Sequence, residues 1–336
     1  MRSRPNSDGL QDRSAAASSI DSRNLPSESL QCQAVGVQSS RALDAPLPGV
    51  TVVVCTRNRP DDLTSSLDAI SRLNPGPNEI LVVDNSDGDP AVERAARERG
   101  ARYVVEREIG LSRARNRGLS ESRSQIVAFI DDDAVPSENW LELLLSPFAD
   151  PQVASASGDV AFHGVPRNAE AAPVRIVGNK DQKWFEMATF GGMGWGANMA
   201  IRKSVCSVWK GFDVRLGKGA PLDIAEESHA FASLLALGYR TAYVPAAVVY
   251  HPVKPWEVRE QAVNSFAFWL LLFCEFPGHR FDLIRFLSRR LRGKALTWPR
   301  ESQEAGQIVS SRWPLLIKAG VAGTLLYLRS RKLRAR

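Results

Sequence analysis

Residues 124–136, SQIVAFIDDDAVP, decide the fold predicted for this chain. The apolar run at 126–130 is unbroken, which is typical of a strand buried on both faces of a parallel sheet. The run ends in three carboxylates, Asp131, Asp132 and Asp133, and Pro136 prevents the strand from continuing as a central one. The stretch therefore predicts a buried strand with a cluster of negative charge at its carboxyl end.

The three aspartates are expected to point in two directions. Residues two apart on an extended backbone face the same way, so Asp131 and Asp133 share a side and Asp132 faces the other. Carboxylates this close repel unless a cation compensates them or protons neutralise some of them. Mg²⁺ or Mn²⁺ is typically held by one or two carboxylates plus substrate phosphates, so we expect a metal–diphosphate site. Two alternatives stay open: an acidic strand end that caps the next helix, and a turn after Ile130 that brings Asp132 into the metal site.

Strands and helices alternate outward from this stretch. Buried strands are predicted at residues 50–55, 79–83, 103–105, 153–162 and 243–250. A helix is expected at 137–148 with Ser137 as its N-cap, whereas residues 163–190 are predicted to be a loop. The alternation indicates an α/β fold with a mostly parallel sheet flanked by helices.

The 336 residues divide into three predicted parts. Residues 1–46 are polar with little apolar periodicity and predict a disordered tail. Residues 47–252 hold the alternating pattern, and residues 253–336 predict a helical, basic extension. The composition, 44% hydrophobic and 24% charged, is typical of a globular protein.

Charge and cysteine usage bear on location and partners. The net charge of +6 is concentrated toward the C-terminus, which suits anionic partners. The apolar stretches 262–274 and 315–328 are shorter than the ~20 residues of a spanning helix. The four cysteines lack paired metal-ligand spacing, and no signal-peptide core is present. We expect a cytoplasmic protein with no nucleic-acid partner; residues 262–274 are either a core helix or part of a peripheral contact with the inner membrane face.

Polar groups follow four of the predicted strands, at Thr56 to Arg59, Asp84 to Asp87, Asp131 to Asp133, and His251. Ligands of open parallel sheets bind outside the carboxyl ends of the strands, so these groups are expected to share one site. Asp84 can accept hydrogen bonds from a base or ribose, and Arg115 can pair with phosphate. The alternatives are a turn-forming aspartate and a solvated arginine on a helix face.

The order of these segments resembles the family-2 glycosyltransferases, which have the GT-A fold. The resemblance lies in VVVCTRNRP, ILVVDNSD, GLSRARNRG, IVAFIDDDAVP, GWGANMAIRK and AEES, between Val50 and His251. It implies inverting transfer of a sugar from a nucleotide-diphospho-sugar to a hydroxyl of a glycan or lipid-linked acceptor. It also implies Mn²⁺ or Mg²⁺ as cofactor, and a place in polysaccharide, glycolipid or cell-surface glycan synthesis.

The resemblance implies a role for particular residues. The DxD metal motif falls on Asp131 and Asp133, and His251 resembles a further metal ligand of some relatives. The acceptor-contacting positions fall on Trp195 and Asn198. The nucleotide-sugar-binding positions fall on Thr56, Arg59, Asp84, Arg115, Asn116 and Asp132, with Gly118 shaping the loop.

The catalytic base implied by the resemblance departs from the family pattern. Relatives usually carry Glu-Asp at the start of a later helix, and the second acid is the base. This chain has Glu226 followed by Glu227, so Glu227 takes the role by position and Glu226 is the alternative. Glutamate is one methylene longer, and the base must come within hydrogen-bond reach of the acceptor hydroxyl. Glu227 could instead complement the helix dipole.

Three other functions share parts of this pattern. An aspartyl phosphatase also uses DxDx(T/V), but that motif normally ends the first strand of its domain. A nucleotidyltransferase usually has a glycine-rich loop after strand one, and residues 56–60 contain no glycine. A non-catalytic nucleotide-sugar-binding scaffold would differ only in lacking the base.

Overall fold

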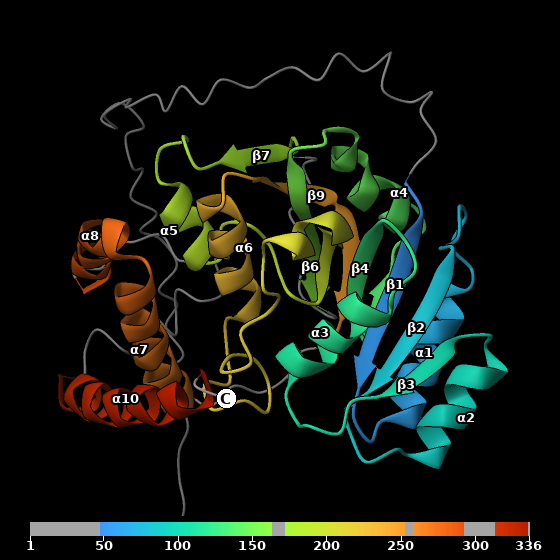
Figure 1. Cartoon of the computed structure of the whole chain (residues 1–336), viewed down its shortest axis with the longest axis horizontal. Coiled ribbons are helices and arrows are strands. Elements are labelled where there is room, and N and C mark those ends of the chain that lie inside the picture. Colours follow the sequence, from blue (N-terminus) through green and yellow to red (C-terminus); the bar gives the residue numbers. More distant parts are fainter. Residues whose placement is uncertain (1–47, 163–171, 253–257, 292–312, 335–336) are drawn as a thin grey trace, which may run out of the picture. The chain divides into compact units, whose positions relative to one another are not determined.

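The computed structural model describes residues 48–162, 172–252, 258–291 and 313–334, all within the compact unit Asp44–Arg336. The tail predicted at 1–46 lies outside the described residues. The described part is a nine-stranded sheet with helices on both faces, so the predicted α/β class is confirmed (Figure 1).

The first half of the sheet is parallel. It consists of β1 (Val50–Thr56), β2 (Glu79–Asp84), β3 (Arg102–Val105) and β4 (Ile126–Asp131), in the spatial order β3-β2-β1-β4. The register pairs Thr56 with Asp84 and Cys55 with Asp131. Three strands therefore end at the same level, which brings their polar ends to one edge as the sequence predicted.

The second half of the sheet mixes strand directions. β8 (Asn198–Arg202) is antiparallel to both β4 and β6 (Val153–Phe162), and β6 is parallel to β9 (Arg240–His251). β7 (Arg175–Gly178) and the two-residue edge strand β5 (Val135–Pro136) pair antiparallel with β9. Pro136 thus lies at an edge, where its missing N–H costs no central ladder bond.

Two layers of helices cover the sheet. α1 (Pro60–Ile70), α2 (Pro90–Glu98) and α4 (Trp140–Leu145) pack with Val52 and Val54 of β1. α3 (Leu111–Glu121), α5 (Trp184–Thr189) and α6 (Glu226–Ala236) pack with Val53 on the opposite face (Figure 1). Alternate residues of one strand point to opposite faces, which explains why the apolar run is continuous.

Two segments differ from the prediction. The helix expected at 137–148 is only α4 and a following 3₁₀ helix, Ser146–Ala149, with Asn139 as the N-cap residue. The helix begins three residues after Ser137, whose N–H donates to Val248 O of β9 (2.9 Å) and continues the pairing of the edge strand. The segment 163–190, predicted to be a loop, contains β7 and α5 in its described part. Its mixed composition carries no clear periodicity, so the sequence did not indicate these elements.

The described parts of the C-terminal extension are helical. It comprises α7 (Val258–Glu275), a 3₁₀ turn (Pro277–His279), α8 (Arg280–Leu291) and α10 (Trp313–Arg334). Of the two alternatives left open for residues 262–274, core packing holds for one face of α7, since Phe268, Leu271 and Leu272 are buried with α6 residues. Among the described residues, no helix is both long and apolar enough to cross a membrane.

Candidate active site

Asp132 ties the turn after β4 to the end of β1. Its Oδ2 accepts a hydrogen bond from Thr56 Oγ1 (2.7 Å), and its Oδ1 accepts one from Arg59 Nη1 (2.9 Å). Burial raises the pKa of Asp132 to about 6 although both donors lower it. The structure thus brings together three residues that were predicted to bind the nucleotide-sugar.

Asp131 and Asp133 share the other side, as strand parity predicted, and His251 at the end of β9 faces both. His251 Nε2 lies 3.0 Å from Asp133 Oδ1 and 3.7 Å from Asp131 Oδ2. Burial lowers the pKa of His251, but hydrogen bonds to the two carboxylates raise it to about 10. Burial raises the pKa of Asp131, yet His251 and Arg115 hold it below its usual value. His251 therefore lies next to both carboxylates of the cluster.

The donor atoms of this cluster fit a divalent cation. One ligand atom from each of Asp131, Asp133 and His251 lies within 4.8 Å of the other two. His251 Nδ1 donates to Pro252 O (2.8 Å), so Nε2 is the nitrogen that faces the carboxylates. Mn²⁺ accepts mixed oxygen and nitrogen ligands, whereas Mg²⁺ prefers oxygen alone. The set is therefore better suited to Mn²⁺.

Arg115 of α3 connects this cluster to the start of α6. Its buried Nη1 pairs with Glu226 Oε1 (2.5 Å). Its Nη2 donates to Gly196 O (2.9 Å) and lies 3.6 Å from Asp131 Oδ1. A Cβ at Gly196 would lie 3.1 Å from either terminal nitrogen, so glycine leaves room for the guanidinium. The guanidinium is buried among these contacts, and the predicted pairing of Arg115 with phosphate stays a prediction.

Glu226 and Glu227 open α6. Glu226 is the ion-pair partner of Arg115, while Glu227 is half-buried next to it. Burial and the charge of Glu226 raise the pKa of Glu227 to about 8. A general base works best with a pKa near the working pH, so this environment favours Glu227 over Glu226 as the base.

The two residues predicted to contact the acceptor differ in their surroundings. Asn198 is fully buried: Oδ1 accepts from Trp140 Nε1 (2.7 Å), and Nδ2 donates to Asp159 O and Ala247 O (both 2.8 Å). With these partners Asn198 holds β8 against its neighbours, and the predicted acceptor contact does not fit. Trp195 is half-buried and keeps an accessible part.

An aromatic row joins Trp195 to the acidic cluster. The ring of Phe162 lies edge-on to Trp195 (5.9 Å between centroids) and to His251 (6.2 Å). Phe162 pairs with His251 in the sheet and was missed by sequence reasoning. Its place at the end of a predicted strand was the only indication available. The row gives the cluster an apolar wall of the kind that sugar rings stack against.

Asn116 and Gly118 of α3 act through backbone packing. Asn116 Oδ1 accepts from Phe212 N, and its Nδ2 donates to Phe212 O (both 2.8 Å). A Cβ at Gly118 would lie 2.7 Å from Val53 Cγ1, so glycine allows α3 to approach β1. Both residues therefore fix the position of α3, and the contacts described are with the protein itself.

Asp84 ends β2 with one oxygen bonded and one unbonded. Oδ2 accepts from Asp89 N (2.8 Å) and Tyr103 Oη (2.7 Å), whereas Oδ1 is buried without a hydrogen-bond partner among the residues described. Burial and the charge of Asp84 raise the pKa of Tyr103, which keeps this hydroxyl a donor. A buried acceptor without a donor is costly, so a bound N–H or O–H that reached Oδ1 would stabilise the structure.

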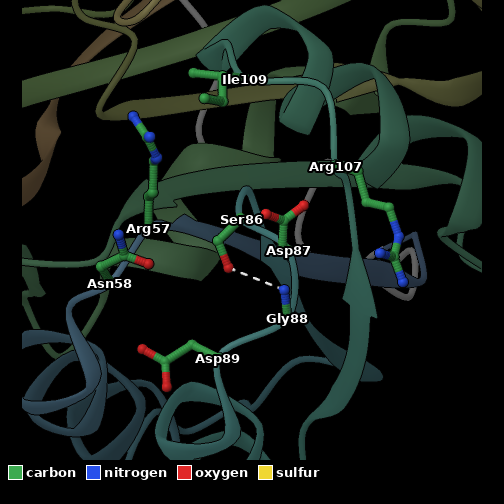
Figure 2. Close-up of a pocket in the computed structure, with 8 residues that line it drawn as sticks. All are labelled: Arg57, Asn58, Ser86, Asp87, Gly88, Asp89, Arg107 and Ile109. Carbon is green, nitrogen blue, oxygen red and sulfur yellow. Dashed lines mark hydrogen bonds between the residues drawn. The ribbon is translucent and has the colours of Figure 1, made fainter.

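A polar pocket of about 290 Å³ lies beyond the ends of β1, β2 and β3. Figure 2 shows side chains from all three strand ends around it, with Gly88 N donating to Ser86 Oγ (3.1 Å). The pocket is lined by Arg57, Asn58, residues 86–89, Arg107 and Ile109. Arg107 and Ile109 were missed by sequence reasoning because they follow the short strand β3, which carried no polar motif.

Comparisons with known proteins give a consistent answer. Residues 51–209 match the family described as Glycosyl transferase family 2. Glycosyltransferase AglE of Haloferax volcanii is 32% identical over 124 residues, 34% of this chain and 40% of that protein. The pre-mycofactocin glycosyltransferase of Mycobacterium tuberculosis is 28% identical over 224 residues, 63% of this chain and 45% of that protein. The chain thus spans less than half the length of these two relatives.

The fold has solved counterparts. The mannosyltransferase PcManGT from Pyrobaculum calidifontis, solved in complex with GDP-Man and Mn²⁺, aligns over 86% of this chain and 92% of its own. The TM-score is 0.54 at 19% identity, which establishes likeness of fold. The predicted GT-A architecture is confirmed by this alignment.

Proposed function

We propose that this chain, whose residues 51–209 match the family-2 glycosyltransferases, transfers a sugar from a nucleotide-diphospho-sugar to an acceptor hydroxyl, with inversion. The observation that carries the proposal is the meeting of Asp131, Asp133 and His251 at the carboxyl edge of the parallel strands. Arg115 joins this cluster to the start of α6, so metal-binding and proton-accepting groups are built into one unit.

Asp131, Asp133 and His251 would hold Mn²⁺ or Mg²⁺ on the donor side. Such an ion, when bound, would supply positive charge to neutralise the diphosphate leaving group. PcManGT was solved with GDP-Man and Mn²⁺, ligands of the same classes. The polar pocket beyond β1 to β3 is the proposed binding site of the nucleoside.

The buried Oδ1 of Asp84 is proposed to accept a hydrogen bond from the nucleoside. A carboxylate only accepts hydrogen bonds, so it complements an N–H of the base or a hydroxyl of the ribose. Every nucleobase of a nucleotide-sugar offers an N–H on its pairing edge, so this contact favours a bound nucleoside without selecting one base.

Glu227 acts on the acceptor side. It accepts the proton of the acceptor hydroxyl as that oxygen bonds to the anomeric carbon, and the bond from that carbon to the diphosphate breaks. The nucleoside diphosphate leaves with the bonding electron pair. The accessible part of Trp195, next to Phe162, offers a stacking surface for a glycan or lipid-linked acceptor.

Donor turnover by the purified chain with Mn²⁺ tests the proposal. Release of nucleoside diphosphate, increased by acceptor, is expected. Release of pyrophosphate would indicate a nucleotidyltransferase, and binding without any product would indicate a scaffold. Either of these results would overturn the proposal.

We also propose that the C-terminal helices dock on an anionic membrane surface. Val321, Leu325 and Leu328 of α10 form an exposed apolar stripe at helical spacing, with exposed Lys318 and Arg329 near its ends. On α8, Phe281 is 73% exposed and lies between two exposed basic residues, Arg280 and Arg285. Apolar residues flanked by basic ones are typical of interfacial helices, and the positive charge favours anionic lipid over a second copy of this equally basic chain.

Vesicle flotation tests the docking surface. Wild-type protein is expected to float with anionic vesicles and to stay behind with zwitterionic ones, and Leu325→Glu is expected to reduce flotation. Val208→Glu changes an equally exposed apolar residue away from these helices and serves as the control. Equal flotation of all three proteins would refute the proposed docking surface. So would a concentration-dependent dimer that Leu325→Glu disrupts while flotation is absent.

A further inference from the structure

A second acidic cluster lies behind the start of α6. Arg215, only 2% exposed, pairs through Nη2 with Glu275 Oε1 (2.5 Å) and through Nε with Asp213 Oδ1 (2.9 Å). The other oxygen of Glu275, Oε2, lies 2.9 Å from His229 Nε2, which donates because a carboxylate only accepts. Their neighbours hold the pKa values of Asp213 and Glu275 below the usual range despite burial, so both are charged.

The cluster joins three parts of the chain. Asp213 and Arg215 belong to the loop that leads into α6, His229 lies on the second turn of α6, and Glu275 is the last residue of α7. Because Glu275 contacts both the loop and the helix, the end of α7 is the point where they are held together. Asn264 of α7 adds a second tie, since its Oδ1 accepts from Asp223 N (3.3 Å).

The same loop packs directly on Glu226. A Cβ at Gly217 would lie 3.0 Å from Glu226 Oε2, so the loop backbone passes against that carboxylate. Ser112 Oγ donates to Leu216 O (2.7 Å), and Leu222 N donates to Arg215 O (2.9 Å). His229 follows Glu226 by one turn on the same face of α6. Glu275 is therefore connected to the first turn of α6 along two routes, through Arg215 and through His229.

We infer that Glu275 is a positioning residue: the end of α7 sets the placement of Glu226 and Glu227. This inference rests on the proposed function of those two acids. It makes the C-terminal extension a working part of the transferase, through an ion network that spans 60 residues of sequence between Arg215 and Glu275. A misplacement of about 1 Å at a catalytic group can cost on the order of a hundredfold in rate.

The test compares two variants that each remove one carboxylate charge. Glu275→Gln is expected to lower kcat about tenfold to a hundredfold with donor KM within about twofold, because the donor pocket lies at the other side of the site. Hydrogen exchange is expected to become faster in residues 213–224. Glu186→Gln breaks the ion pair of α5 with Arg289 of α8 and is the control; it is expected to change neither readout.

Two further comparisons keep the inference falsifiable. Glu275→Asp keeps the charge and is expected to recover part of kcat. Should Glu275→Gln fail to fold, Asp213→Asn removes the other carboxylate charge that pairs with the Arg215 guanidinium and tests the same network. Unchanged exchange in the loop, or unchanged kcat in a folded variant, would overturn the inference. A wild-type chain without donor turnover would refute the proposed function, whereas the exchange experiment would still test the network.

Discussion

Two clusters of this chain contain the same chemical groups in different surroundings. Asp131, Asp133 and His251 lie at the sheet edge, and Asp213, His229 and Glu275 lie behind α6. In each cluster one ligand atom per residue lies within 4.8 Å of the other two. By composition and spacing alone, either could hold a metal ion.

The cation already supplied by the protein distinguishes them. Arg215 sits between Asp213 and Glu275 and is almost fully buried, so its guanidinium compensates both carboxylates. At the sheet edge, Arg59 reaches Asp133 Oδ2 (3.3 Å) and is 43% exposed, while Asp133 Oδ1 faces His251. A buried arginine that pairs with both carboxylates makes the first arrangement structural. At the sheet edge the buried Arg115 lies 3.6 Å from Asp131 but pairs with Glu226. The imidazole and the partly exposed arginine that face Asp133 leave this cluster able to exchange their charge for a metal and a diphosphate.

The largest expected effect is that of Asp133→Ala. Losing a ligand of the sheet-edge cluster should lower donor turnover at least about a thousandfold, because the leaving diphosphate is no longer neutralised. Nucleoside diphosphate release measures this. The control is Asp68→Ala, which removes a carboxylate paired with Arg99 on the helical layer (2.7 Å). Comparable turnover in the two variants would break the distinction between the clusters.

Glu227→Gln tests the proton acceptor on the acceptor side of the site. We expect kcat to fall about a hundredfold or more while the donor KM stays near the wild-type value, since only the proton acceptor is lost. Steady-state kinetics with a saturating acceptor measures this. Full activity in Glu227→Gln would transfer the role of base to Glu226 or to another residue.

Asp84→Asn tests the nucleoside pocket. The amide can place an N–H where the carboxylate offered an acceptor, so donor affinity should fall about tenfold to a hundredfold. The change in kcat should be small because Asp84 lies at the nucleoside end of the site. Binding of nucleotide-sugars followed by calorimetry measures this, and unchanged affinity would show that Oδ1 contacts no ligand.

The smallest expected effect is the dependence of activity on pH. Burial and the charge of Glu226 raise the pKa of Glu227 to about 8, and the base must be deprotonated to act. The value of kcat/KM should therefore rise about tenfold per pH unit below that pKa and level off above it. Glu227→Gln should lack this rising limb. A profile that is flat between pH 6 and 9 in the wild type would contradict the assignment.

The sequence predicted the parts of the site that depend on strand geometry. Asp131 and Asp133 share a side because a strand has a period of two residues, and His251 joins them because its strand ends at the same edge. The fold class followed from the alternation of apolar runs. These features depend on local pattern, which a single sequence contains.

The parts that the sequence did not predict depend on long-range contacts. No sequence pattern indicated that Arg115 pairs with Glu226, which lies 111 residues away. Asn198 was expected to meet an acceptor, but Trp140, Asp159 and Ala247 take up its hydrogen-bonding groups. The pairing of Arg215 with Glu275 joins a loop to the C-terminal extension. No local pattern specifies which distant residue will bury a polar side chain.

Titration of Mn²⁺ into three proteins tests the central distinction most directly. Wild type and Asp213→Asn should each bind one Mn²⁺ per chain with similar affinity, because the proposed ion contacts Asp131, Asp133 and His251 only. Asp133→Ala should lose that binding. Binding of Mn²⁺ by Asp133→Ala as tight as by wild type would refute the metal site at the sheet edge, and so would loss of binding in a folded Asp213→Asn.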